Sequence, residues 1–313
     1  MVKVRRKKVY RMKRVNKRRN RWKFILRRIV VFSLLVTFFI SLKYILSKKN
    51  DFISVDSINN YIKYVDDFSE RRGQLNWQEV AAIDSVKNVD FNNINKKKID
   101  VICKEFYDKD GKIKDFDEVL TEQDFTDKEK RKAKKNLNHL SDISLRSMEH
   151  HNKEKDKFIE SMRKISIDNY KKNGILPSVA ISQAILESNW GKSELSAKYN
   201  NYFGIKADAG WKGRVVNYST KENYDDVIDA DFRAYDSMGD SVDDFGKFLN
   251  ENRRYKENGL FDGKNYIEQA QALENAGYST KKNDKGEAIY ADLLIKLIRD
   301  NNLMLIDNEA FKS

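Results

Sequence analysis

The sequence has few of the side chains that cross-link a protein or bind a metal. It contains a single cysteine, Cys103, so no disulfide can form within the chain and an exported fold must be stabilised by its core alone. Cys103 lies in an apolar stretch, where we expect it to pack as a small buried hydrophobic residue. The three histidines, His139, His150 and His151, do not make up a zinc ligand set. We therefore expect neither a metal nor a cofactor.

Acidic residues are absent from the first 28 positions. Residues 1–28 hold 15 of the 61 Lys and Arg residues, which leaves 46 basic against 48 acidic residues for the rest of the chain. The formal net charge of +13 therefore belongs to this N-terminal segment. No basic groove for nucleic acid is expected in the body of the protein.

A long apolar run follows the basic segment. Residues 29–46, with Lys43 near their end, just reach the ~17–20 residues that an α-helix needs to cross a bilayer. No small-residue cleavage pattern follows Leu46, so an uncleaved membrane anchor is favoured over a signal peptide. The excess of Lys and Arg before the run predicts a cytoplasmic N-terminus. We expect a single-pass protein of the cell membrane that is extracytoplasmic from residue 47 onward.

Residues 47–150 are expected to form a helical accessory or spacer region. Apolar residues recur there at three- and four-residue spacing, as in 77–86. The charged run 126–135 is more typical of a solvated helix face or a linker than of a binding patch. Asp108–Gly111 resembles a calcium loop but fails its ligand spacing, so a tight turn is expected. An alternative is that this region is a degenerate copy of the unit that follows it.

A second unit, spanning residues 155–303, is predicted to be mainly helical. Its first helix, over 156–172, is closed by Asn173-Gly174, a common C-terminal stop. Two strand-like runs, 214–220 and 227–235, are joined by a polar turn. Further helices are expected at 193–198, 240–252, 263–275 and 287–301. The fold class is therefore α+β, mainly α, with a small β-hairpin inserted early, and no solenoid repeat is visible.

The most informative stretch of this unit is Ala180–Gly191. Pro177 suits the first turn of a helix, and the dense apolar pattern after it predicts a helix largely buried in a core. Glu187 stands at the end of this helix, just before Trp190. A carboxylic acid held beside apolar and aromatic groups loses hydration, which raises its pKa and suits it to general acid catalysis near neutral pH. The alternative is that Glu187 lies on the solvated face as the helix ends.

Five motifs in this unit occur in the order seen in one enzyme family. They are Ala184–Gly191, Asn200–Lys206, Thr220–Glu222, Asp231–Tyr235 and Ala276–Thr280. On these motifs, residues 158–301 resemble the glucosaminidase domain of glycoside hydrolase family 73, which comprises cell-wall hydrolases with a lysozyme-like fold. The resemblance covers less than half of the chain.

The resemblance implies roles for three catalytic candidates. Glu187 matches the family's catalytic acid, which would protonate the glycosidic oxygen. Glu222, in the turn of the hairpin, matches a second carboxylate that would activate water or steady the oxocarbenium charge. An acetamido sugar can also assist through its own carbonyl, so a protein nucleophile is not required. Tyr278 matches a tyrosine that the family presents to the substrate sugar.

Three neighbouring residues are candidates for substrate binding. Tyr202, Phe203 and Gly204 match the floor of the family's cleft, where a planar ring stacks on a sugar and Gly204 permits close backbone approach. Packing in the core is the alternative for the two aromatic rings.

The sequence departs from the family after Tyr278. The stretch Lys281–Tyr290 is longer than the family's turn and lacks its proline, which puts the shape of that cleft edge in question. We expect a membrane-anchored peptidoglycan hydrolase that cleaves the β-1,4 bond after N-acetylglucosamine in cell-wall glycan strands. A muramidase or a lytic transglycosylase acting on the same polymer, and a non-catalytic wall-binding protein, are the alternatives.

Overall fold

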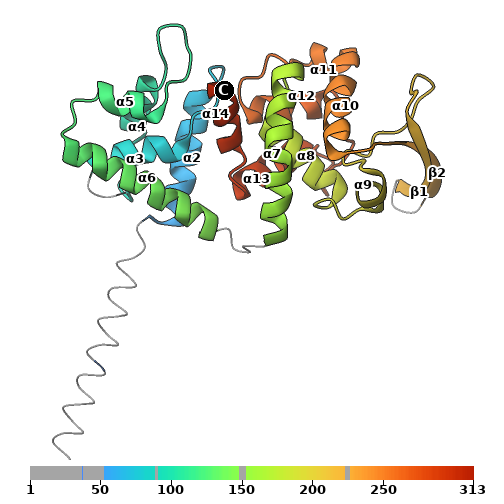
Figure 1. The fold of residues 1–313 in the computed structure, drawn as a ribbon, viewed down its shortest axis with the longest axis horizontal. Helices are drawn as coiled ribbons and strands as arrows, with labels where there is room; N and C mark the ends of the chain where they lie inside the picture. The colour runs from blue at the N-terminus through green and yellow to red at the C-terminus, as the bar shows by residue number, and fades with distance from the viewer. Residues whose placement is uncertain (1–36, 38–52, 89–90, 148–152, 223–225) are drawn as a thin grey trace, which may run out of the picture. The chain divides into compact units, whose positions relative to one another are not determined.

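The computed structural model describes residue 37 and residues 53–88, 91–147, 153–222 and 226–313. Within it, Val55–Ser313 form one compact unit (Figure 1). The predicted membrane span at 29–46 lies outside the described residues apart from Thr37, as do His150 and His151. Among the helices that are described, none is long and apolar enough to cross a bilayer.

The first half of the compact unit consists of helices packed around α3. These helices are α2 (Val55–Ser69), α3 (Trp77–Lys87), α4 (Lys96–Glu105), α5 (Phe116–Glu122) and α6 (Asp127–Ser147). Asn76 caps α3 by accepting hydrogen bonds from the backbone of Gln78 and Glu79. Trp77, Val80 and Ile83 are each at most 1% exposed, because α2, α4 and α6 all pack against this helix.

Two local predictions for this half are confirmed. The charged run 126–135 opens α6, with Ala133 buried and most of its charged side chains exposed. Asp108–Gly111 forms a turn in which Oδ1 of Asp108 accepts hydrogen bonds from the backbone of Asp110 and Lys112. Both stretches are therefore structural features of the surface.

The second half is mainly helical, with a small two-stranded sheet, as predicted. Its helices are α7 (Lys153–Asn173), α8 (Pro177–Ser188), α9 (Glu194–Tyr199), α10 (Met238–Glu251), α11 (Arg253–Glu257), α12 (Tyr266–Asn275), α13 (Tyr290–Asp300) and α14 (Met304–Lys312). Helix α7 ends at the predicted stop, where Gly174 adopts a left-handed φ of +76°. Helix α8 packs against α7, α12, α13 and α14, so nearly all of its side chains are buried. The sequence pattern did not predict α11 and α14.

The hairpin is longer than predicted. Strands β1 (Arg214–Glu222) and β2 (Asp226–Ala234) pair antiparallel, with Val216 opposite Phe232 and Glu222 opposite Asp226. Glu222 is therefore the last residue of β1 rather than a turn residue. Lys221 pairs with Val227 and Glu222 with Asp226, so backbone pairing continues past the point where charge suggested a loop.

A buried polar network joins the two halves of the unit. Asp66 on α2 is 2% exposed and accepts hydrogen bonds from the Tyr266 hydroxyl and, at 3.0 Å, from Arg299 Nη2. Burial raises the pKa of Asp66, although both of these donors oppose that rise. The indole of Trp77 donates to Asn302 at 3.2 Å. The accessory helices thus pack directly on the helices that follow the hairpin.

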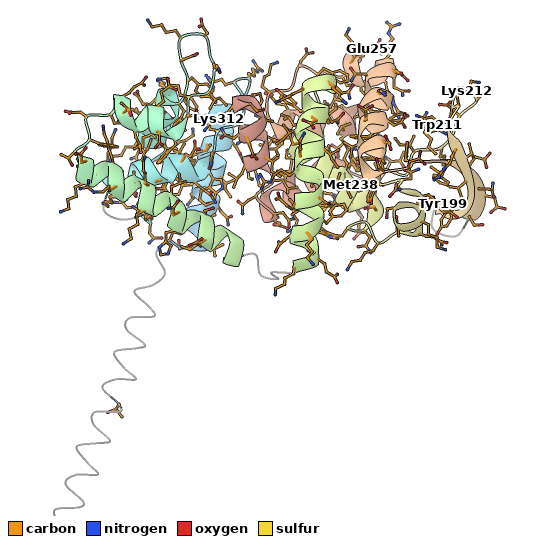
Figure 2. All side chains as sticks on the ribbon, in the orientation of Figure 1. Tyr199, Trp211, Lys212, Met238, Glu257 and Lys312 are labelled. Carbon is orange, nitrogen blue, oxygen red and sulfur yellow. The ribbon has the colours of Figure 1, made fainter. Side chains whose placement is uncertain are left out.

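The C-terminal helix contributes to the same junction. Lys312 of α14, labelled in Figure 2, forms an ion pair with Glu79 of α3 at 3.0 Å. On the same helix, the carboxylate of Asp307 accepts hydrogen bonds from the backbone and the hydroxyl of Ser178, at 2.8 and 2.6 Å. Asp307 thereby supplies the cap at the start of α8 that Leu176, at the capping position, lacks.

Candidate active site

Glu187 lies in the last turn of α8, directly before a tight left-handed turn. Asn189, Trp190 and Gly191 have φ angles of +49°, +62° and +73°. The Ser188 hydroxyl accepts a hydrogen bond from the backbone of Gly191 at 2.7 Å and so fixes this turn. A Cβ added at Gly191 would lie 3.0 Å from the Phe158 ring, so both the φ and the close approach favour glycine. The helix therefore stops at a defined point and leaves the Glu187 side chain accessible.

The carboxyl group of Glu187 is open to solvent yet closely surrounded by protein. Its side chain is exposed. Desolvation by the neighbouring groups nevertheless raises its pKa, against a hydrogen bond from Tyr290 and the positive charge of Lys281, which both lower it. The upward shift of the Glu187 pKa agrees with the sequence prediction. A carboxyl group with a raised pKa keeps its proton to higher pH and can release it to an adjacent oxygen.

A hydrogen-bond chain orients this carboxyl group. Gln183 Nε2 donates to the Tyr290 hydroxyl at 2.9 Å, and that hydroxyl donates to Oε1 of Glu187 at 3.1 Å. Gln183 and Tyr290 are 0% and 1% exposed, so neither can exchange its partner for water. Because Gln183 occupies a lone pair of the tyrosine oxygen, the hydroxyl proton is directed at Glu187.

The sequence prediction gave no role to Tyr290. One signal was present: Gln183 and Glu187 lie four residues apart and so share one face of α8. The backbone of Ala291 donates a hydrogen bond to the Glu274 carboxylate at 3.0 Å, which helps to fix the start of α13. Only the packing of α13 on α8 brings these positions together.

Tyr278 lies beside this chain. Its ring stacks on Tyr290, with 5.3 Å between centroids and an interplanar angle of 21°, and its centroid is 6.2 Å from that of Tyr255. Burial first, and the negative charge of Glu187 second, raise the pKa of the Tyr278 hydroxyl well above its usual value. The hydroxyl therefore stays protonated and can donate a hydrogen bond. The structure thus brings the predicted residues Glu187 and Tyr278 together.

The three predicted substrate-binding residues differ in their placement. Tyr202 is half-buried, and its ring lies 6.1 Å from that of Phe158, near the left-handed turn. Phe203 is 3% exposed and stacks on Phe245 with 3.9 Å between centroids. Phe203 thus has no free face for a sugar, so core packing replaces the predicted contact.

The predicted sugar contact of Gly204 stays a prediction. Gly204 is exposed, and a Cβ added to it would meet no atom within 4 Å. No other part of the protein approaches it closely enough to require a glycine. Its left-handed φ of +63° favours glycine, because residues with a Cβ adopt that conformation at a cost.

The structure describes only the backbone of Glu222, at the end of β1. The predicted catalytic role of its side chain therefore stays a prediction.

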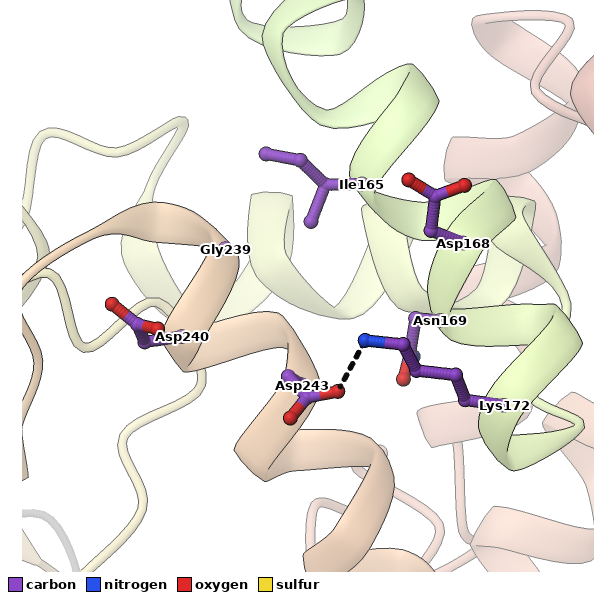
Figure 3. Close-up of a pocket in the computed structure, with 7 residues that line it drawn as sticks. All are labelled: Ile165, Asp168, Asn169, Lys172, Gly239, Asp240 and Asp243. Atoms are coloured by element: carbon purple, nitrogen blue, oxygen red, sulfur yellow. Dashed lines mark hydrogen bonds and ion pairs between the residues drawn. The ribbon is translucent and has the colours of Figure 1, made fainter.

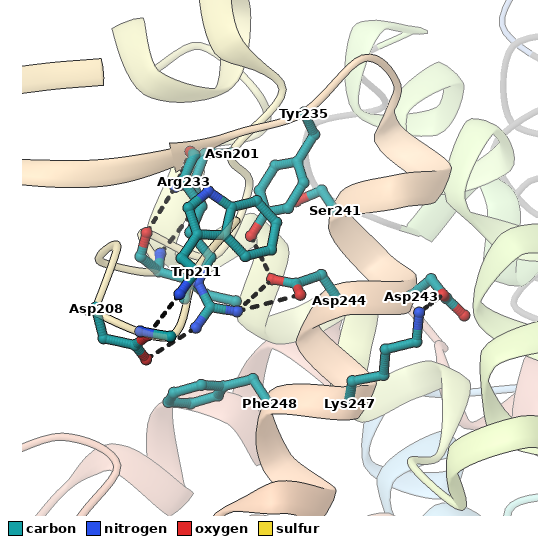
Figure 4. A network of polar contacts seen from close by, with 12 residues as sticks. Asn201, Asp208, Trp211, Arg233, Tyr235, Ser241, Asp243, Asp244, Lys247 and Phe248 are labelled. Carbon is teal, nitrogen blue, oxygen red and sulfur yellow. Dashed lines mark hydrogen bonds and ion pairs between the residues drawn. The ribbon is translucent and has the colours of Figure 1, made fainter. Parts of the chain in front are cut away.

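The hairpin is attached to the helices through Arg233, which the sequence prediction did not single out (Figure 4). Arg233 is 8% exposed and donates to Asp244 of α10 at 2.9 Å and to Asp208 at 3.1 Å. The Trp211 ring covers its guanidinium at 4.6 Å, and the Tyr235 hydroxyl donates to Asp244 at 2.6 Å. Arginine suits this position because its planar fork can bind two carboxylates while a ring stacks on it.

A groove between α7 and α10 lies apart from Glu187 and the other predicted site residues (Figure 3). It encloses about 290 Å³ and is lined by Ile165, Asp168, Asn169, Lys172, Gly239, Asp240 and Asp243. Lys172 pairs with Asp243 at 3.2 Å across it. None of the predicted site residues lines this groove. Over the described part of the chain, no group of three or more His, Cys, Asp or Glu residues is placed to hold a metal ion.

Comparison with known proteins identifies similar chains. A family model named Glucosaminidase, described as mannosyl-glycoprotein endo-beta-N-acetylglucosaminidase, matches residues 163–303. Exo-glucosaminidase LytG of Bacillus subtilis is 35% identical over 170 residues, which cover 51% of this chain and 57% of that protein. Peptidoglycan hydrolase FlgJ of Vibrio parahaemolyticus is 32% identical over 152 residues, covering 45% of this chain and 46% of that protein. The chain thus spans about half the length of the curated relatives that it matches.

Two further proteins are similar over parts of the chain. A probable N-acetylmuramidase of Lactococcus lactis is 43% identical over 91 residues, covering 28% of this chain and 20% of that protein. The crystal structure of the catalytic domain of the autolysin Auto from Listeria monocytogenes is 30% identical and has a TM-score of 0.44; the match covers 59% of this chain and all of that domain.

Proposed function

This chain belongs to the glucosaminidase family through its residues 163–303, and we propose that it is a peptidoglycan hydrolase that cleaves the β-1,4 bond after N-acetylglucosamine in cell-wall glycan strands. One observation carries the proposal: an accessible carboxyl group, Glu187, has a raised pKa and is oriented by the buried hydroxyl of Tyr290. The names of its relatives LytG and FlgJ support both the sugar and the polymer.

In the proposed reaction Glu187 is the general acid. Its Oε1 accepts the Tyr290 hydrogen bond, so the proton is carried by Oε2 and passes from there to the glycosidic oxygen as the bond to the anomeric carbon breaks. The carboxylate left behind keeps the Tyr290 hydrogen bond, which is stronger to a charged acceptor than to a neutral one. Tyr290 thus favours the products of proton transfer.

The positive charge that develops on the sugar must be stabilised, or neutralised by attack of water, with the help of a second group. We propose Glu222 for this role, as base for the attacking water or as a charge that stabilises the oxocarbenium ion; its match to the second carboxylate of the family supports it. The substrate's own acetamido carbonyl is the alternative. Tyr278, whose hydroxyl stays protonated, is proposed to donate a hydrogen bond to the sugar beside Glu187.

A muramidase is the second candidate. The 43% identity to a probable N-acetylmuramidase over 91 residues favours it. A lytic transglycosylase would use the same lone acid without water, and a non-catalytic wall-binding protein would keep the fold without cutting. Each activity leaves a different end on the glycan.

Mass spectrometry of the products separates these candidates. The full-length protein in detergent is incubated with purified glycan strands, and the new ends are identified. Reducing N-acetylglucosamine is the expected end. Reducing N-acetylmuramic acid alone would identify a muramidase, the anhydro form a transglycosylase, and uncut strands a binding protein, and each of these results would refute the proposed bond specificity.

We also propose that residues 29–46 anchor the enzyme in the cell membrane with residues from 47 onward outside. The apolar run and the 15 basic residues before it support this orientation. Membranes washed at high pH should retain the protein, and protease added to cells with permeable walls should digest the part after residue 47. Release by the wash, or full protection from protease, would contradict the anchor or its orientation.

A further inference from the structure

The loop between Tyr278 and α13 is where the sequence departs from its family, and the structure shows that it is internally braced. The backbone of Asn283 donates to the Glu287 carbonyl at 2.9 Å, and that of Gly286 donates to the Asn283 carbonyl at 2.9 Å. Lys282 and Ala288 form an antiparallel bridge, and Gly286 has a left-handed φ of +80°. The loop therefore presents its side chains from a defined backbone.

This loop lies next to the proposed proton donor. The carbonyl of Lys281 accepts a hydrogen bond from the backbone of Ile289 at 3.3 Å. Ile289 directly precedes Tyr290, whose hydroxyl bonds to Glu187. The positive charge of Lys281 acts on Glu187, where it lowers the pKa of the carboxyl group against the larger effect of desolvation.

The lysines of the loop are available to bind an anion. Lys281, Lys282 and Lys285 are exposed, and none of them forms an ion pair in the part of the chain that the structure describes. Of the two acidic residues in the loop, Glu287 is bonded to an amide of the loop at 2.7 Å and Asp284 is exposed. Three cationic side chains therefore project into solvent from this loop, and Lys281 is the one whose charge acts on Glu187.

A cation at this position does not favour proton donation, since it stabilises the ionised form of Glu187. It would favour a substrate that brings negative charge to the same edge. Peptidoglycan carries carboxylates at two places: on the lactyl group of muramic acid when no peptide is attached, and on the stem peptide. Both present the same chemistry to a lysine.

We propose that the loop Lys281–Ala288 is a cationic rim that selects glycan strands bearing carboxylates over neutral ones, with Lys281 making the contact nearest the bond that is cut. This inference rests on the proposed function. Exposed ion pairs are weak, so each lysine should contribute about two- to fivefold in kcat/KM. The preference should also fall with added salt, because these charges are screened.

Three substrates made from one glycan test the proposal. They are strands with stem peptides, peptide-free strands with free lactyl carboxylates, and peptide-free strands whose carboxylates are amidated. Full-length wild type, Lys281→Met and the triple variant Lys281→Met, Lys282→Met, Lys285→Met are compared by kcat/KM. Lys171→Met, which removes an exposed lysine from α7, is the matched control.

Wild type should prefer the carboxylate-bearing strands, and Lys281→Met should reduce that ratio by about two- to fivefold, with a larger loss in the triple variant and none in Lys171→Met. A contrast between free and amidated peptide-free strands would identify the lactyl carboxylate as the group that is bound. A contrast seen only with stem peptides would identify the peptide carboxylates.

Two results would overturn the rim. One is an unchanged substrate ratio in the triple variant, which would leave the hydrolase itself intact. The other is a wild type that cuts carboxylate-bearing and amidated strands equally well. If wild type cuts none of the three strands, the proposed function fails, which is a distinct outcome.

Discussion

Replacing Tyr290 by phenylalanine removes one hydroxyl group and tests how Glu187 is held. The hydroxyl donates to Oε1 of Glu187 at 3.1 Å and accepts from Gln183 at 2.9 Å. A hydrogen bond to a charged group is worth about 1.5–3 kcal/mol. Because Glu187 is open to solvent, we expect the lower end, which corresponds to a loss of about tenfold in kcat.

The pH profile gives the same substitution a signature that is independent of rate. The Tyr290 hydrogen bond lowers the pKa of Glu187, so its loss lets burial raise that pKa further. The acid then stays protonated to higher pH. In Tyr290→Phe the plateau of kcat/KM should therefore fall while its basic limb moves to higher pH.

Stability has to be measured alongside activity. Phenylalanine leaves the buried amide of Gln183 without its acceptor, which should cost about 1–3 kcal/mol and lower Tm. Tyr255→Phe is the matched control, since it removes a hydroxyl that bonds to Arg254 and not to Glu187. Tyr290→Phe with an unchanged plateau and basic limb would show that this hydroxyl does not act on Glu187.

Three further substitutions test the fold around the site. Burial raises the pKa of Asp307 to about 7, so its protonated form stabilises the fold below its ordinary pKa and this contribution is lost as pH rises toward 7. Asp307→Asn should abolish the resulting decline in unfolding free energy between pH 5 and pH 8, measured by urea denaturation. An equal decline in the variant would contradict the assignment. Phe203→Ala should destabilise the protein by about 3–5 kcal/mol in urea denaturation, while the KM of the folded enzyme stays near wild type. A raised KM with unchanged stability would instead support the predicted contact between Phe203 and a sugar. Asp66→Ala removes the partner of Tyr266 and of the half-exposed Arg299, so it should lower the free energy of unfolding by about 1–3 kcal/mol. The variant should still unfold in one cooperative thermal transition, and two separate transitions would show that the accessory helices fold independently.

The helix that carries Glu187 could be predicted because its signals are local. A buried helix that carries one carboxylate just before Trp190 and Gly191 is visible in the residue pattern. The left-handed turn that ends this helix was not predicted. The hairpin was also predicted from local signals, although its strands extend to Glu222 and Asp226. Charge at those positions suggested a loop, but strand pairing continued.

The remaining features depend on contacts between distant segments. Phe203 was assigned to a sugar because motif position does not show which ring is covered, and Phe245, which covers it, lies on α10. Asp307 and Asp66 received no role because their partners are more than a hundred residues away. Burial and pairing of this kind become visible only once the helices are packed.

The most direct test of the account is the activity of Glu187→Gln on purified glycan strands. Glutamine keeps the shape of the side chain and the Tyr290 contact but has no proton to give, and general acid catalysis contributes about 10²–10⁴-fold. We predict a loss of that size in kcat, with wild-type Tm and with retained binding to the strands. Cleavage by Glu187→Gln at the wild-type rate would contradict the proposal that Glu187 is the proton donor.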